Sequence, residues 1–140
     1  MKFKILLGLP AMLMLAGCGS SLSCSSADVK ETVTSILVDA SRDQRVVSAL
    51  STMEIDNIAT LDIDEDLGTY HCSAQLQYDP DDGKEPVIKE VEYEVQPVES
   101  EDADFQVLYD ASELGEFKTR VALRSGLEYG EALQERMHGP

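Results

Sequence analysis

The chain of 140 residues contains no tryptophan, only two histidines, and only 11 lysine and arginine residues against 27 aspartate and glutamate residues. Its formal net charge of -16 repels phosphate backbones, which excludes nucleic-acid binding. The sequence also lacks the nucleophile-elbow, phosphate-loop and zinc-protease motifs. His71 and His138 are therefore expected to be surface residues. The sequence predicts a protein that is not an enzyme and needs no cofactor.

A long apolar run is also missing, although a short one stands near the N-terminus. Lys2 and Lys4 precede an uncharged apolar segment over residues 5–16, which is shorter than the roughly 20 residues that a membrane-spanning helix needs. Basic residues, a short apolar segment and the small residues Ala16 and Gly17 are typical of a secretory signal peptide. We therefore expect a signal peptide over residues 1–17.

The residues that end this segment, Leu15-Ala16-Gly17-Cys18, resemble the lipobox of bacterial lipoproteins. The resemblance implies that the Cys18 thiol is lipidated, that residues 1–17 are removed and that acyl chains hold the protein in a membrane. Gly19 follows the cysteine, where aspartate tends to retain Gram-negative lipoproteins in the inner membrane, so the outer membrane is favoured. The periplasmic face and the outer surface of that membrane are both alternatives. The alternative is an ordinary secretory signal with an incidental Cys18.

With Cys18 assigned to the lipid, Cys24 and Cys72 remain as an even pair in an exported chain. Exported compartments are oxidising, so a disulfide is the default. Zinc binding is the weaker alternative, because neither cysteine has a second ligand at zinc-site spacing. Residues 18–24 then form a short membrane tether. The five residues between lipid and disulfide span at most about 18 Å.

Residues 25–137 are long enough for one domain with its own core. Apolar residues recur at helical spacing after Ser26, at Val29, Val33, Ile36, Leu37 and Ala40. From Met53 the period changes to two, which predicts strands over residues 53–63, 70–78, 87–95 and 105–109. Short polar turns between them indicate antiparallel pairing.

Residues 117–124 fit two patterns. Phe117, Thr119, Val121 and Leu123 alternate with charged residues and predict a last strand, but Leu114, Phe117 and Val121 also fit a helix. Residues 125–137 predict a short C-terminal helix. The expected fold is therefore α+β, with an N-terminal amphipathic helix packed on an antiparallel sheet of about four to five strands and a short helix at the end.

The acidic residues are concentrated in the middle of the chain, where 19 of them lie between Met53 and Glu113 against Lys84 and Lys89 alone. Asp62, Asp64 and Asp66 resemble the start of a calcium loop. An EF-hand requires glycine and glutamate where Leu67 and Ser73 stand. We therefore expect no metal site, and these three aspartates are the weak candidates for one.

Two predicted strands carry opposite charges on their polar faces. Glu90, Glu92 and Glu94 stand on one, and Lys118, Arg120 and Arg124 stand on the other. Opposite charges on neighbouring strands favour each other, so we expect them to pair internally. The alternative is a basic strip that stays free to meet lipid headgroups or a partner.

The anchor, the short tether, the acidic body and the missing catalytic motifs predict a membrane-anchored lipoprotein that acts as a non-enzymatic binding module, with a possible protein partner that has a basic surface. Cys72-Ser73-Ala74-Gln75-Leu76 and Tyr93-Glu94-Val95 resemble segments of small Gram-negative lipoproteins, some carried on prophages. That resemblance implies an alternative, an accessory protein of a mobile element that excludes phage or a toxin at the envelope. A small ligand carrier or hydrolase is a third candidate and would require a pocket.

Overall fold

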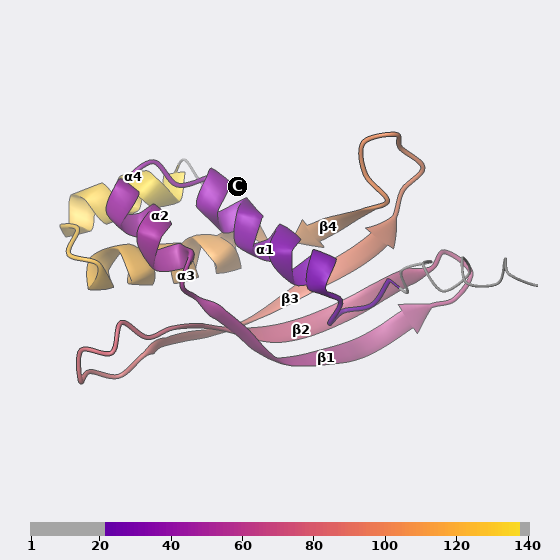
Figure 1. Cartoon of the computed structure of the whole chain (residues 1–140), viewed down its shortest axis with the longest axis horizontal. Coiled ribbons are helices and arrows are strands. Elements are labelled where there is room, and N and C mark those ends of the chain that lie inside the picture. The colour runs from indigo at the N-terminus through magenta and orange to yellow at the C-terminus, as the bar shows by residue number, and fades with distance from the viewer. Residues whose placement is uncertain (1–21, 138–140) are drawn as a thin grey trace, which may run out of the picture.

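The structure is a computed structural model that describes residues 22–137. The predicted signal peptide, Cys18 and His138 lie outside the described residues. The predicted α+β class is confirmed (Figure 1). In chain order the elements are α1 (Ala27–Asp39), α2 (Gln44–Leu50), β1 (Glu54–Asp64), β2 (Thr69–Tyr78), β3 (Val87–Pro97), β4 (Phe105–Tyr109), α3 (Ala111–Arg124) and α4 (Tyr129–Met137).

The four strands form one sheet in the order β1-β2-β3-β4, and each neighbouring pair is antiparallel. Each strand is followed by its spatial neighbour, as the short polar turns predict. The β2–β3 turn contains Gly83, whose φ of +80° is in the region that glycine adopts at little cost. The four predicted strand regions before residue 110 are thereby confirmed, with ends shifted by a few residues.

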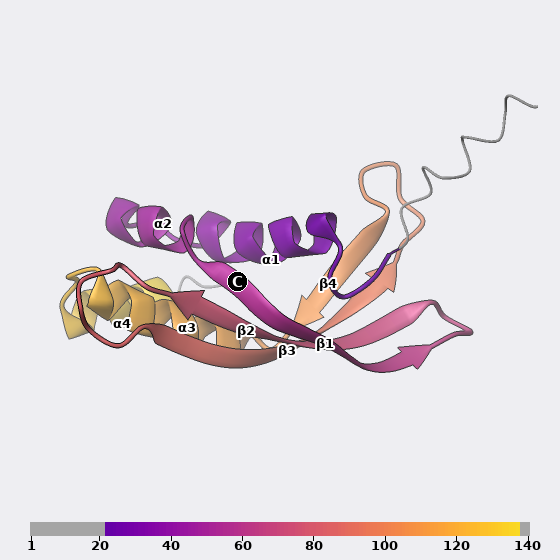
Figure 2. The same ribbon diagram turned by 60° about the horizontal axis from the view of Figure 1, so that its bottom comes forward.

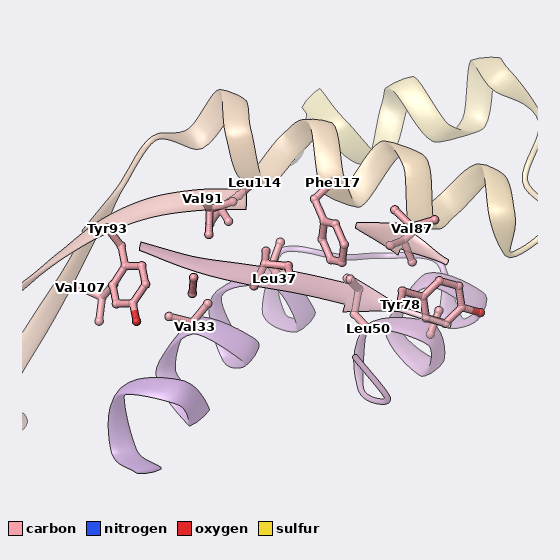
Figure 3. Packing of buried hydrophobic residues seen from close by; sticks show 14 of the residues in the cluster. Val33, Leu37, Leu50, Tyr78, Val87, Val91, Tyr93, Val107, Leu114 and Phe117 are labelled. Carbon is pink, nitrogen blue, oxygen red and sulfur yellow. The ribbon is translucent and has the colours of Figure 1, made fainter. Parts of the chain in front are cut away.

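In the described part of the chain, the helices cover one face of the sheet and leave the other face to solvent (Figure 2). Along β2 the side chains of Cys72, Ala74 and Leu76 are buried, and those of the intervening residues are not. Buried side chains of α1 to α3, including Leu37, Leu50 and Phe117, fill the space between these helices and the sheet (Figure 3). Each large apolar side chain buried here contributes about 1.5–3 kcal/mol.

The N-terminal amphipathic helix is confirmed as α1. Val29, Val33 and Leu37 are buried on one side of it, at the spacing that brings them onto one helical stripe. The helix begins after Ser26, whose extended backbone provides the first turn with its carbonyl acceptor. Among residues 22–137, no helix has the length and apolar character needed to cross a membrane.

The prediction of a last strand over residues 117–124 is wrong, because this segment belongs to α3. Asp110 caps the helix by accepting a hydrogen bond from the Ser112 N–H at 2.8 Å. The helix buries Leu114, Phe117 and Val121, whereas a strand would have had to bury Leu123, which is 40 % exposed. Helical spacing therefore brings Leu114, Phe117 and Val121 onto one buried stripe and leaves Leu123 outside it. The predicted short C-terminal helix is confirmed as α4.

Candidate functional site

The predicted disulfide between Cys24 and Cys72 is present and buried, with the two Cα atoms 5.7 Å apart. It fixes the segment before α1 to β2. Two side chains from the sheet reinforce it: the Tyr93 hydroxyl donates to the Cys24 carbonyl at 2.9 Å, and the Thr60 hydroxyl lies 3.4 Å from the Cys24 Sγ. Burial raises the pKa of Tyr93. The start of the domain is thus held against three strands.

The segment at residues 22–24 lies at the same end of the molecule as the β1–β2 turn and the β3–β4 connection, as both views show (Figures 1 and 2). We call this end the tether end. α2, α3 and α4 lie at the opposite end. The last residue of β1 and the two connections at the tether end carry Asp64, Glu65, Asp66, Glu99, Glu101, Asp102 and Asp104. Anything attached through the preceding residues therefore meets an acidic end of the domain.

The uncovered side of the sheet, which we call the open face, receives side chains from all four strands. In the strand register, Asp62 pairs with His71, His71 pairs with Glu94, and Glu94 pairs with Leu108. Directly paired residues project to the same face, so these side chains form one row across the sheet. Neighbouring rows add Glu54, Asp56, Ala59, Ser73, Gln75, Gln77, Ile88, Glu90 and Glu92.

Few contacts engage the acids of the open face. The His71 Nδ1 lies 3.6 Å from a carboxylate oxygen of Glu94, and the Gln96 amide donates to the other oxygen. Among the residues that the structure describes, no hydroxyl or thiol side chain hydrogen-bonds the His71 ring. The row thus brings a histidine next to a carboxylate.

A shallow depression of about 630 Å³ crosses this row. Its polar side chains come from Asp62, His71, Glu92, Glu94 and Asp110, and its exposed apolar side chains come from Leu61 and Leu108. Leu61 is 54 % and Leu108 is 44 % exposed. Hydrogen bonds from the Ser112 hydroxyl and N–H lower the pKa of Asp110. The depression therefore combines acidic side chains with two exposed apolar ones.

The sequence predicts that the basic side chains of residues 118–124 pair with Glu90, Glu92 and Glu94. This prediction is wrong, because these side chains contact other groups. These bases lie on α3, not on a strand. Arg120 donates to the Ile88 carbonyl at 2.8 Å, and Arg124 pairs with Asp82 and donates to the Glu85 carbonyl. They are held internally, and none of these contacts reaches Glu90, Glu92 or Glu94.

The burial of Lys118 differs most from what the sequence predicts. Its side chain is fully buried; its Nζ donates to the Ala40 carbonyl at 2.8 Å and lies 3.9 Å from a Glu135 carboxylate oxygen. Glu135 in turn accepts from the N–H groups of Arg42 and Asp43. Burial lowers the pKa of Lys118, and Glu135 opposes that shift. A helical assignment would have revealed this residue, because position 118 falls within the stripe that contains Leu114 and Val121.

The weak calcium candidates are not brought together. The Asp64 carboxylate accepts hydrogen bonds from the N–H groups of Asp66 and Leu67, and so it closes the β1–β2 turn. Asp62 lies on the open face instead. Within residues 22–137, no three acidic, histidine or cysteine side chains are arranged to hold a metal ion.

No protein-family model matches the chain, and no curated protein or solved structure is significantly similar to it. The charge, shape and placement of the open face are therefore the features that bear on its function.

Proposed function

We propose that this protein is a lipid-anchored protein of the bacterial envelope, held in the outer membrane, that acts as a non-enzymatic binding module. The LAGC sequence that ends at Cys18 supports the anchor, and Gly19 supports the outer membrane. The open face is the observation that carries the binding role. Within residues 22–137, no other element covers this side of the four-stranded sheet, and the side bears carboxylates without a lysine or arginine partner around a depression.

The anchor and the open face are compatible in space. The five residues between Cys18 and the disulfide reach at most about 18 Å, so the tether end would stand next to the bilayer. The strands extend between the tether end and the helical end and alternate in direction (Figure 1). The open face would then extend away from the membrane, where a partner could reach it.

Metabolic labelling with an alkyne fatty acid tests the anchor in cells that express the full chain. We expect label on the wild type and none on Cys18→Ser, because the thiol is the only site at which this lipidation pathway begins. Ser21→Ala, a neighbouring change outside the lipobox, is the control and should keep the label. Membrane separation should place the labelled protein in the outer-membrane fraction. Equal label on wild type and Cys18→Ser would overturn the proposal.

A further inference from the structure

We propose that the open face binds an extended, cationic segment of a partner protein, with lysine or arginine side chains at alternate positions. This inference rests on the proposed binding role and specifies its ligand. The carboxylates that would meet the segment are those of Glu90, Glu92 and Glu94, which follow one another along β3 on the same face. Asp62 and Asp56 stand on the same face on β1.

No lysine or arginine side chain within the sheet lies on the open face to balance its charge. Lys89 is the single lysine or arginine in the four strands. It pairs in register with the buried Leu76, so it lies on the covered side, where its Nζ is 3.0 Å from Glu116. His71, beside Glu94, is the one other titratable base on the sheet. A cationic partner is therefore the complement that this face lacks.

The spacing of the acids favours an extended segment. Alternate residues of a strand stand about 6.6 Å apart, so Glu90, Glu92 and Glu94 present carboxylates at that interval. A second extended chain that lies along the face presents its own alternate side chains at the same interval. Basic residues at every second position would thus each meet a carboxylate.

The apolar side chains of the depression suit the same ligand. Leu61 and Leu108 flank the acids and are about half exposed. Lysine and arginine carry a long apolar stem below the charge, and such stems cover apolar surface while the charged end stays hydrated or paired. One basic side chain could therefore contact a leucine and a carboxylate together. A second copy of this chain would instead place one acidic face against another.

Binding of a short peptide of alternating lysine and serine tests the inference. The protein is the full chain purified from membranes in detergent, and the titration is followed by fluorescence anisotropy of a labelled peptide at moderate salt. Glu90→Gln, Glu92→Gln and Glu94→Gln together should weaken binding about tenfold, since three exposed ion pairs are removed. The matched control is Glu65→Gln, Glu99→Gln and Glu101→Gln, which removes the same charge from the tether end and should change the affinity less than about twofold.

Carbodiimide cross-linking gives the second measurement, and the peptide lysines should be joined mainly to glutamates of the open face. Equal weakening by the two triple variants would overturn the inference, because net charge alone would then explain binding. Absence of binding by the wild type, a dimer that buries the open face, or binding of calcium in place of the peptide would also overturn it. Label on Cys18 together with any of these results would leave the anchor standing and remove only this ligand.

Discussion

Single residues fix this domain in two different ways. Cys24 and Cys72 could be paired from the sequence, because only one partner was left for each once Cys18 was assigned to the lipid. The buried bond between them joins α1 to the sheet. Lys118 could not be recognised in the same way, since its role depends on Ala40 and Glu135, which come from distant parts of the chain. The sequence alone is sufficient to pair the two cysteines, whereas the contacts of Lys118 depend on how distant elements pack against one another.

Lys118→Met should destabilise the domain severely. Methionine fills a similar volume, but the change leaves Glu135 buried without its cation and the Ala40 carbonyl without its donor. Breaking a buried pair from one side costs about 3–5 kcal/mol. Urea denaturation should show this loss in the free energy of unfolding, and the exposed Lys30→Met should stay within about 0.5 kcal/mol of the wild type.

A double variant separates lost pairing from lost volume. Glu135→Gln keeps an oxygen that can accept from the Arg42 and Asp43 N–H groups, and it removes the charge that Lys118 balances. Lys118→Met with Glu135→Gln should therefore be less destabilised than the sum of the two single variants. Strict additivity would show that the two side chains do not interact.

At the scale of the elements, alternation was sufficient for β2 and β3, because each strand has one buried and one exposed face. It failed at α3, where Phe117 and Val121 satisfy both periods. Tertiary packing decided between the two, since α3 lies beside the part of β3 that extends beyond β4. The open face was only partly predictable: the sequence predicted the acidic side of β3, but the row across four strands depends on the sheet register.

The side chains of α3 take the place of a fifth strand along this part of β3. Arg120 donates to the Ile88 carbonyl, Glu113 accepts from the Glu92 N–H at 3.3 Å, and Arg124 donates to the Glu85 carbonyl. These residues recur on one side of the helix. An unpaired strand edge is a template for aggregation, and α3 covers it with polar side chains.

Arg120→Ala together with Arg124→Ala should loosen this cover. Two charge-assisted hydrogen-bond sites are lost, which we expect to lower the free energy of unfolding by about 2 kcal/mol. Amide hydrogen exchange should rise at Glu92, whose N–H faces α3, and change less at Val91, whose N–H faces β2 by the alternation of strand groups. Lys30→Ala with Arg42→Ala removes the same charge elsewhere and is the control. Equal exchange at Glu92 in the two variants would show that α3 does not protect the edge.

The whole molecule carries far more negative charge than its own bases can balance. The net charge of -16 becomes about -18 once Lys2 and Lys4 are removed with the proposed signal peptide. The basic side chains of α3 are held by partners within the fold, and the open face and the tether end keep their acids exposed. Such a molecule repels itself when folded, and it repels an anionic membrane most strongly at the tether end.

Added salt should therefore stabilise the soluble body of residues 19–140 at neutral pH. Raising NaCl from about 10 mM to about 150 mM shortens the screening length from about 30 Å to about 8 Å, so acids on different strands and turns cease to repel. We expect Tm to rise by several degrees, because a gain of about 1 kcal/mol shifts a domain of this size by roughly 4 °C. Choline chloride at equal ionic strength should give the same rise, which would attribute it to screening.

The variant with Glu90→Gln, Glu92→Gln and Glu94→Gln should begin from a higher Tm and gain less. A Tm that stays flat or falls over this range would mean that the exposed carboxylates do not repel one another in the folded domain, and the open face would then lose the uncompensated charge on which its proposed ligand depends.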